Sequence, residues 1–409
     1  MRRFAPAVAV AAALVLTGCG TPDAQSVDAG GAGRAPMAEG GPGTTSAPVR
    51  AGVPELRVTE IAGGFANPWD VGVLPDGRVL VTEREGRLTL LSGTQPGATA
   101  TPVTADLSDV LAQGEGGLMG MVVHPDFAET GRFTTCQTHV EGGTATDVRL
   151  VTWELDGTTA RRVADPLLGG LPINPSGRHS GCRPTLAADG ALVVGTGDTA
   201  RGAIPQDLSS LGGKVLRVDL ATGAALPDNP FAGVDDPAQR LILSYGHRNV
   251  QGVAVAADGT VYTAEHGPST DDEVNRITPG GNYGWDPAQG GTVGGYDESV
   301  PMTDLDRYPD AVPAAWSSGS PVEAVSGAAF LAGPAWGDLD GALAVGALRG
   351  EKLLLMTLGP DGAVASVGVP APLDGTFGRL RAVRLAPDGA LLLSTSNGSD
   401  DRILRIDPV

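Results

Sequence analysis

The sequence predicts an all-β fold, a six-bladed β-propeller, on three observations. The first is a recurring pattern in which two stretches of alternating apolar residues flank an Asp-Gly pair. Asp-Gly between such stretches is a strong β-hairpin signal, because Gly adopts a positive φ at no steric cost. The second is the content of 61 Gly and 32 Pro, which suits many short strands joined by turns. The third is the length of 409 residues, since all-β units of this size commonly form one domain.

The hairpin pattern occurs six times along the chain. Four clear copies span residues 71–81, 184–194, 253–262 and 383–393, and looser copies span 121–133 and 327–345. One hairpin every 50 to 70 residues, roughly, is typical of propeller blades and is not explained by a β-sandwich or a parallel β-helix. We expect a strand near 56–61 to pair beside 403–406 and thereby close the ring.

The N-terminal segment has the features of a targeting signal. Met1-Arg2-Arg3 is positively charged, and residues 7–16 form an apolar run too short to span a bilayer. Leu16-Thr17-Gly18-Cys19 resembles a bacterial lipobox, which predicts a lipoprotein signal peptide over 1–18 and a lipid anchor on Cys19. An ordinary secretory signal with an incidental Cys is the alternative. Either interpretation predicts export, and the first predicts a bacterial cell-membrane lipoprotein facing the extracytoplasmic side.

The signal is followed by a segment, 19–53, that is rich in Gly, Ala and Pro and poor in large apolar residues. Such a segment cannot bury enough surface to offset its ordering entropy, so we expect a disordered, flexible tether. The propeller is then expected over 54–409. The formal net charge of the whole chain is −19, which argues against nucleic acid as a partner, because phosphates require a basic surface.

Two cysteines remain after Cys19. Cys136 and Cys182 both lie in strand-like stretches of a chain that is expected to be exported. An oxidising compartment favours a disulfide between them. Two free, buried thiols are the alternative.

Polar clusters at the ends of the expected strands are the candidate site. Glu115 lies in a Gly-rich turn, where it is either a ligand contact or a solvated carboxylate. His179 lies between glycines at 177 and 181, which favours projection into a cavity over core packing. Imidazole titrates near neutrality and can accept a proton from a hydroxyl. Asp198 ends the partner strand of the same hairpin and can orient His179; an ordinary loop role for the histidine is the alternative.

A family resemblance emerges from these and later motifs. The chain carries Gly-Glu-Gly-Gly-Leu at 114–118, Arg-His-Ser-Gly at 178–181, Tyr-Gly-His-Arg-Asn-x-Gln-Gly at 245–252, Gly-Pro-x-x-x-Asp-Glu-x-Asn at 267–275 and Gly-Asn-Tyr-Gly-Trp at 281–285. In this order they resemble the soluble sugar dehydrogenases that depend on pyrroloquinoline quinone (PQQ), the glucose/sorbosone and aldose sugar dehydrogenase family. The resemblance covers residues 56–409, and the family fold is a six-bladed propeller.

The resemblance implies an activity and a role for individual residues. His179 matches the general base that takes a proton from the anomeric hydroxyl of an aldose while hydride passes to PQQ and a lactone forms. Asp198 matches the carboxylate that supports that base. The PQQ contacts are implied at Glu115 and at four further positions, which are Arg248, Asn249, Arg379 and Arg381. The i, i+2 spacing of the last two predicts guanidinium groups on one face of a strand, suited to the carboxylates of PQQ.

The resemblance also implies a calcium ion that polarises the reactive carbonyl of PQQ. Backbone oxygens of Gly267 and Pro268 are its expected ligands, and Glu273 and Tyr283 match a calcium-associated cluster. The carboxylates at 271–273 suit calcium, which prefers many oxygen ligands. A plain acidic loop is the alternative for this run.

Two positions depart from the family pattern. Glu115 stands where sugar-oxidising members often carry Gln, and Leu348 stands where glucose enzymes carry a Lys that contacts the cofactor. Together these changes remove one cation and add one anion near a polyanionic cofactor, so they bear on PQQ affinity. A catalytically silent propeller that binds a sugar or a protein is therefore the alternative function. Neither the sugar, nor the electron acceptor, nor the oligomeric state follows from the sequence.

Overall fold

The computed structural model describes residues 55–409. The expected signal peptide, Cys19 and the expected tether lie outside the described residues. Within 55–409, no helix has both the length and the apolar character needed to cross a membrane.

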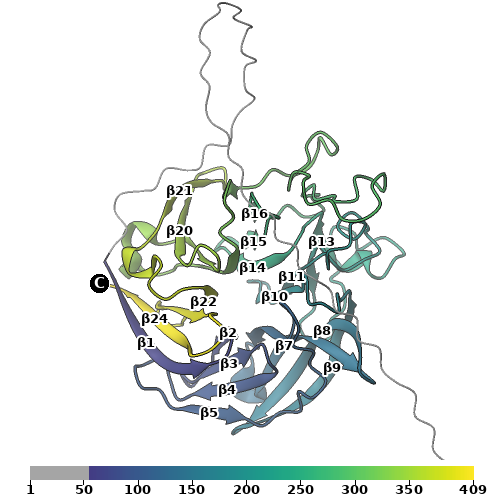
Figure 1. Cartoon of the computed structure of the whole chain (residues 1–409). Coiled ribbons are helices and arrows are strands. Elements are labelled where there is room, and N and C mark those ends of the chain that lie inside the picture. Colours follow the sequence, from purple (N-terminus) through teal and green to yellow (C-terminus); the bar gives the residue numbers. More distant parts are fainter. Residues whose placement is uncertain (1–54) are drawn as a thin grey trace, which may run out of the picture. The chain divides into compact units, whose positions relative to one another are not determined.

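The described part of the chain forms six antiparallel sheets of four strands each (Figure 1). The first three sheets comprise β2 (Pro68–Val73), β3 (Val79–Glu83), β4 (Arg87–Leu91) and β5 (Ala100–Val103); β6 (Leu118–Val123), β7 (Arg132–Glu141), β8 (Thr144–Asp156) and β9 (Thr159–Leu171); and β10 (Gly181–Leu186), β11 (Leu192–Thr196), β12 (Lys214–Val218) and β13 (Ile242–Tyr245).

The remaining three sheets follow in chain order, except that the last one takes its outer strand from the N-terminal end. They comprise β14 (Val250–Val255), β15 (Val261–Glu265), β16 (Glu273–Arg276) and β17 (Trp316–Ser317); β18 (Val325–Phe330), β19 (Leu343–Ala347), β20 (Leu353–Leu358) and β21 (Val364–Gly368); and β22 (Leu380–Leu385), β23 (Leu391–Thr395), β24 (Asp401–Pro408) and β1 (Leu56–Phe65). The helical elements are short, namely α1 (Phe127–Thr130), η1 (Gln239–Leu241), η2 (Pro334–Leu339) and η3 (Ala371–Leu373).

The sheets are the blades of a six-bladed propeller, as the hairpin pattern predicts. The first strand of each sheet contacts the first strand of the next, in the cyclic order β2, β6, β10, β14, β18, β22 and back to β2. Each of the six predicted hairpins supplies the first two strands of one blade. The predicted ring closure is also present, because β1 pairs with β24 from Leu56 opposite Pro408 to Phe65 opposite Asp401.

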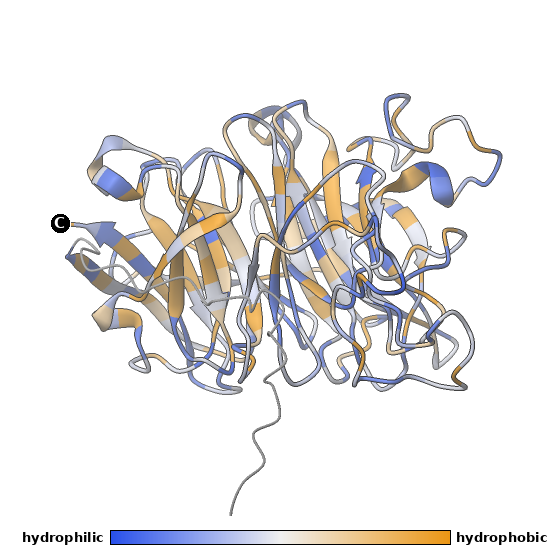
Figure 2. Ribbon diagram, turned by 90° about the horizontal axis from the view of Figure 1, so that it is seen from above, coloured by the Kyte–Doolittle hydropathy of each residue, from blue (hydrophilic) through white to orange (hydrophobic). Residues whose placement is uncertain are grey.

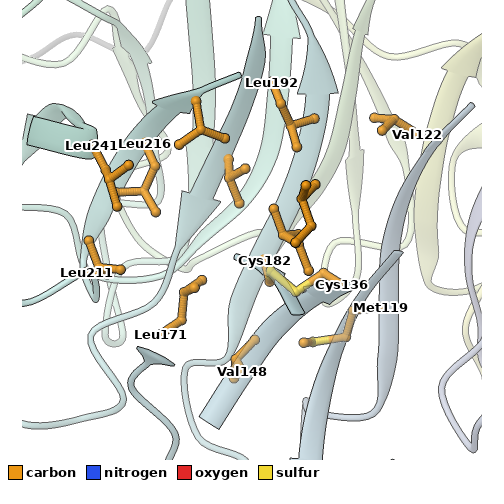
Figure 3. Close-up of a cluster of buried hydrophobic side chains, with 14 of the residues drawn as sticks. Met119, Val122, Cys136, Val148, Leu171, Cys182, Leu192, Leu211, Leu216 and Leu241 are labelled. Carbon is orange, nitrogen blue, oxygen red and sulfur yellow. A yellow bond between two sulfur atoms is a disulfide. The ribbon is translucent and has the colours of Figure 1, made fainter. Parts of the chain in front are cut away.

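Apolar residues fill the space between adjacent blades. Figure 2 shows them concentrated along the strands, while hydrophilic residues predominate in the loops. One cluster between the second and third blades is drawn in Figure 3 and includes Met119, Val148, Leu171, Leu192, Leu216 and the half-cystines Cys136 and Cys182. Because every blade packs on two neighbours, the ring holds its central strands in fixed positions.

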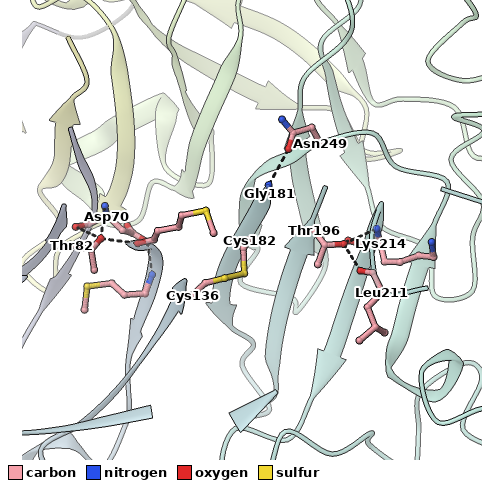
Figure 4. Close-up of a disulfide and its surroundings, with 11 residues drawn as sticks. Asp70, Thr82, Cys136, Gly181, Cys182, Thr196, Leu211, Lys214 and Asn249 are labelled. Atoms are coloured by element: carbon pink, nitrogen blue, oxygen red, sulfur yellow. Dashed lines mark hydrogen bonds between the residues drawn. A yellow bond between two sulfur atoms is a disulfide. The ribbon is translucent and has the colours of Figure 1, made fainter. Parts of the chain in front are cut away.

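A disulfide joins Cys136 to Cys182, which confirms the predicted pairing (Figure 4). Their Cα atoms lie 6.0 Å apart, a normal separation for a disulfide. The bond links β7 of the second blade to β10 of the third, and both half-cystines are fully buried. Cys182 follows the polar segment 177–181 directly, so the disulfide fixes the start of β10.

Candidate active site

The predicted site residues gather at one mouth of the propeller. In an antiparallel hairpin the start of one strand lies beside the end of its partner, so both positions reach the same edge. Glu115 precedes β6, His179 precedes β10 and Arg248 precedes β14, whereas Asp198 follows β11. An isolated bridge between Gly197 and Asn249 joins the third and fourth blades at this edge.

His179 is held in an unusual backbone conformation. Its φ is 50°, in the left-handed region that non-Gly residues rarely adopt, and Gly177 has a φ of 77°. A side chain at Gly177 would collide with the backbone carbonyl of Gln113, so the close approach of the two loops requires glycine there. Left-handed backbone at a non-Gly residue costs roughly 1 kcal/mol or more and is common at functional sites.

His179 and Asp198 form a buried pair. The Nδ1 atom of His179 lies 2.7 Å from Oδ1 of Asp198, and the two residues are 4% and 0% exposed. The same Oδ1 accepts a hydrogen bond from the backbone N–H of Ala200 at 2.8 Å. This geometry fixes the imidazole tautomer, with the proton on Nδ1 and a free lone pair on Nε2. The pair therefore provides a base whose Nε2 can accept a proton.

Two aromatic residues complete the environment of Asp198. Its Oδ2 atom accepts hydrogen bonds from Nε1 of Trp285 at 2.9 Å and from the hydroxyl of Tyr296 at 2.6 Å. The Tyr296 hydroxyl also lies 3.3 Å from Nδ1 of His179. Burial and the negative charge of Asp198 raise the pKa of Tyr296, so the phenol stays protonated and donates. The carboxylate is thus oriented from both oxygen atoms.

Glu115 lies at the centre of the predicted cofactor contacts. Its Oε2 atom accepts from Nδ2 of Asn249 at 2.8 Å and from Nε2 of Gln251 at 3.2 Å. Burial opposes ionisation of Glu115, but His266, His179 and the Asn249 hydrogen bond, with a contribution from Arg381, outweigh burial and lower its pKa. The side chain is therefore an anion at neutral pH.

Arg248 and Asn249 turn toward the same region. The Arg248 side chain is 5% exposed, donates from Nη1 to the carbonyl oxygen of His266 at 3.0 Å, and lies 5.7 Å from the centre of the Trp285 ring. Asn249 accepts at Oδ1 from the backbone N–H of Gly181, at 3.1 Å, and so ties the fourth blade to the histidine loop (Figure 4).

The two arginines of the Arg-x-Arg pair differ from the prediction in one respect. Arg379 lies just before β22, is exposed, and is not part of the strand, whereas Arg381 lies within β22 and is 8% exposed. A register shift between Leu380 and Val383 interrupts the regular alternation at this end of the strand. The expectation of two guanidinium groups side by side on one strand face is therefore wrong.

The donor set fits an anionic ligand such as a polycarboxylate. Arg381 contacts Ser396 and Gln251 but makes no ion pair within residues 55–409. Burial, together with the nearby Arg183, lowers the pKa of Arg381 to about 9, and Glu115 offsets this only in part. In addition, Nε of Arg248 and Nε2 of His266 are buried and have no hydrogen-bond partner in the described chain. A bound carboxylate would satisfy such groups.

The predicted calcium ligands Gly267 and Pro268 follow β15 at the same mouth. The Gly267 N–H donates to Oδ1 of Asp272 at 2.9 Å, and the buried Oδ2 of Asp272 has no partner in the described chain. No donor in residues 55–409 reaches the carbonyl oxygens of Gly267 or Pro268. These oxygens are the type that calcium prefers, so the residues fit the ion.

Glu273 and Tyr283 lie among other partners. Glu273 accepts from Thr303 at 3.1 Å and from Asn275 at 3.2 Å, and burial beside Glu265 raises its pKa to about 8. Tyr283 is buried between strands, and its hydroxyl donates to the Arg276 carbonyl at 2.6 Å. Neither side chain offers a free ionised oxygen in this arrangement, so their part in a calcium site stays a prediction.

Leu348 is buried at 2% exposure and Arg349 beside it is exposed, but both lie in the bend that follows β19, whereas the sequence suggests a strand there. The position therefore contributes no cation to the site. Compensation for the ionised Glu115 comes instead from His266, His179 and Arg381.

The structure adds contacts that the sequence did not predict. Gln251 could have been found from its motif, because it follows Asn249 by two positions, and its Nε2 donates to Oδ1 of Asn249 at 3.1 Å. Trp285 also stands in a motif, although nothing there indicates its bond to Asp198. Tyr296 and Glu298 lie in a long segment without a motif, and Arg178 becomes relevant only through Glu298. No local pattern indicates that Tyr296, Glu298 and Arg178 contact residues about a hundred positions away in the chain.

Comparison with known proteins gives a consistent picture. Residues 65–405 match the family model described as glucose / sorbosone dehydrogenase. The aldose sugar dehydrogenase YliI of Escherichia coli is 30% identical over 86% of this chain and 93% of its own length. The PQQ-bound aldose sugar dehydrogenase of Streptomyces coelicolor is 31% identical, covers 88% of this chain and 99% of that structure, and gives a TM-score of 0.69. A Thermus thermophilus oxidoreductase described as a glucose dehydrogenase is 35% identical over 86% of this chain and 100% of its own, with a TM-score of 0.72.

Proposed function

The chain belongs to the glucose/sorbosone dehydrogenase family, and from this we propose that it is an exported, PQQ- and calcium-dependent dehydrogenase that oxidises an aldose to a lactone. The observation that carries the proposal is the buried pair of His179 and Asp198, which lies at the same mouth as the buried arginines Arg248 and Arg381. The first provides a base, and the second provides a place for a polyanionic cofactor.

The protein residues act as follows in this proposal. Nε2 of His179 takes the proton from the anomeric hydroxyl of the sugar, and Asp198 stabilises the imidazolium that forms. Trp285 and Tyr296 hold the Asp198 carboxylate in place, so the base needs no reorientation during turnover. Bound PQQ would supply the two-electron acceptor for the reaction, and bound calcium would supply Lewis-acid polarisation of it.

The cofactor contacts are proposed at Arg248, Asn249, Arg379 and Arg381, and the calcium contacts at the carbonyl oxygens of Gly267 and Pro268. Support for the first set is the unpartnered Nε of Arg248 and the unpaired charge of Arg381. Support for the second is that no protein donor in the described chain reaches the two carbonyl oxygens. An exported lipoprotein anchored through Cys19 remains a proposal that rests on the sequence of 1–19 alone.

One observation favours a second candidate, a silent propeller that binds a sugar or a protein. Glu115 is ionised at the cofactor contacts, and Leu348 supplies no cation to offset it. The hydrogen bonds that Asn249 and Gln251 donate to Glu115 spread its charge and reduce the repulsion. The buried pair of His179 and Asp198, which a silent propeller would not need, makes the dehydrogenase the better supported function.

The experiment that tests the proposal is an assay of aldose oxidation with PQQ, Ca²⁺ and an artificial electron acceptor. We expect turnover by the wild type and a fall in kcat of roughly 100- to 10,000-fold in His179→Ala, because the general base is lost. PQQ binding should be retained in this variant. His139→Ala is the matched control, since His139 also pairs with an aspartate, Asp109 at 3.1 Å, but outside the site.

Two outcomes separate the candidates. PQQ binding without oxidation of any sugar in a broad aldose panel contradicts the dehydrogenase. Equal activity in His179→Ala and His139→Ala would remove His179 from the reaction.

A further inference from the structure

A long segment from the fourth blade reaches over the site and contacts it at two points. The segment lies between Trp285 and β17, and Tyr296 within it donates to Asp198 at 2.6 Å. Two residues later, Oε1 of Glu298 lies 2.6 Å from Nη2 of Arg248 and 3.1 Å from Nη2 of Arg178. One carboxylate oxygen is thus shared between two arginines.

The two arginines provide different environments. Arg248 is 5% exposed at its side chain, packs over Trp285, and is fixed through Nη1 by the carbonyl oxygen of His266. Arg178 is 50% exposed at its side chain and lies over the ring of Tyr296 at 5.8 Å. Arg248 is therefore a preorganised position for an anion, whereas Arg178 is a surface arginine that can follow a moving partner.

We propose that Glu298 occupies the anion position of Arg248 in the cofactor-free protein and thereby sets the affinity for PQQ. A PQQ carboxylate displaces Glu298 from Arg248, and the displaced carboxylate keeps its ion pair with Arg178. This inference rests on the proposed function, because it takes Arg248 to be a cofactor contact.

Charge and geometry support the exchange. Arg248 has its Nη1 engaged by a backbone oxygen and its Nη2 engaged by Glu298, so a second carboxylate at Nη2 competes directly. Glu298 is 41% exposed at its side chain, so leaving Arg248 requires little desolvation or rearrangement of packed groups. Since Arg178 already contacts the same oxygen atom, the displaced carboxylate stays neutralised during the exchange.

The test is a titration of PQQ into the purified protein at a fixed Ca²⁺ concentration, followed by quenching of tryptophan fluorescence. We expect E298Q to bind PQQ about five- to tenfold more tightly than the wild type, because the competing charge is removed. Asp306→Asn is the matched control, since Asp306 is an exposed carboxylate of the same segment. It should leave Kd within about twofold, because screening weakens distant surface charges.

A double-mutant cycle tests the role of Arg178. R178Q should weaken PQQ binding in the wild-type background, because Glu298 then has Arg248 as its remaining partner. The same substitution should have little effect in the E298Q background, so the two changes are expected to be non-additive. Equal weakening in both backgrounds overturns the role of Arg178 as the second partner.

The remaining outcomes distinguish this inference from the proposed function. An unchanged or weakened Kd in E298Q, with the wild type binding PQQ, overturns the inference and leaves the dehydrogenase standing. Failure of both proteins to bind PQQ overturns the proposed function, and with it the competition at Arg248.

Discussion

Lys214 illustrates how a single buried residue holds the loops of the site in place. Its side chain is fully buried, and Nζ donates to the carbonyl oxygens of Ile204 at 2.8 Å, Pro205 at 3.1 Å and Gly212 at 2.6 Å. These carbonyls belong to the loop that follows Asp198, and Gly246 in turn donates its N–H to Pro205. The ammonium group therefore ties this loop to the segment that carries Arg248.

The charge state of Lys214 predicts a pH dependence of stability. Burial lowers its pKa from 10.5 to about 7, so between these values the unfolded chain binds more protons than the folded chain. Stability contributed by this group must then rise with pH across that window, by at most about 1.4 kcal/mol per pH unit. Chemical denaturation between pH 7 and 9 should show the wild type gaining stability relative to Lys214→Met. A constant difference over this range would show that Lys214 keeps its charge in both states.

For single residues, the sequence singled out His179 and Asp198 as a candidate base and its carboxylate because both stand in distinctive Gly-rich motifs, and the structure places the two side chains 2.7 Å apart. The sequence also placed Glu115, Arg248 and Asn249 next to the ends of strands, and the structure shows all three at one mouth of the propeller. It could not identify the partners of these groups. Hydrogen bonds such as Tyr296 to Asp198 depend on how a long segment folds back, and no local signal encodes that.

Among the elements, the strand β10 and its neighbour β7 are joined by the disulfide. Cys136 and Cys182 are separated by 46 residues in the sequence, and Cys182 lies three positions after His179. The link therefore restrains the second blade against the third next to the base. Figure 3 shows it within the apolar cluster between these blades.

Removal of this disulfide should lower stability measurably. A bond that closes a loop of this length is worth about 4 kcal/mol in the chain-entropy account. For a domain of this size that corresponds to a fall in Tm of about 5 °C. Differential scanning calorimetry of Cys136→Ser/Cys182→Ser should show the decrease, with Thr138→Ser, on the same strand, as a mild control. An unchanged Tm would indicate that packing alone holds the two blades.

Hairpins were predictable at the element scale because Asp-Gly turns and period-two alternation are local signals. The strand β17, with two residues, was not, since its pairing with β16 follows from the long segment between them. The start of β22 shows the same limit. The strand begins at Leu380, after Arg379, and a register shift follows between Leu380 and Val383, although the sequence alternates as if both arginines belonged to one regular strand.

Polar contacts on the central strands connect four of the blades around Asp70. Asp70 in β2 accepts from Nε of Arg384 in β22 at 2.9 Å and lies 2.9 Å from Nη1 of Arg183 in β10. It also accepts from the backbone N–H of Met121 in β6 at 3.0 Å. Burial opposes the ionisation of Asp70, but Arg384 and Arg183 outweigh it and lower its pKa. Four of the six blades thus share one carboxylate.

Asp70→Asn should destabilise the molecule strongly. Removal of the charge leaves the buried Arg183 and the partly buried Arg384 without this compensation, and breaking a buried pair in this way typically costs roughly 3–5 kcal/mol. Urea denaturation should show a lower midpoint, with Asp76→Asn, at the exposed turn of the same hairpin, as the control. Equal midpoints for the two variants would mean that the ring does not depend on the central cluster.

The ring itself was predictable from the number of hairpins and from the apolar strand at 56–61. The Asp70 cluster was not, because its members lie more than 300 residues apart at the extremes and stand in otherwise apolar strands. Closure brings them together, and only the complete fold reveals that the charges are matched.

The most direct test of the central claim, that His179 is the base of a PQQ-dependent sugar dehydrogenase, is a single-turnover measurement. Protein loaded with PQQ and Ca²⁺ is mixed with an aldose that the wild type oxidises, and the absorbance of the bound quinone is followed. We expect rapid reduction in the wild type and a rate roughly 100-fold or more lower in His179→Ala, with equal PQQ loading. Reduction at the same rate in both proteins would contradict it.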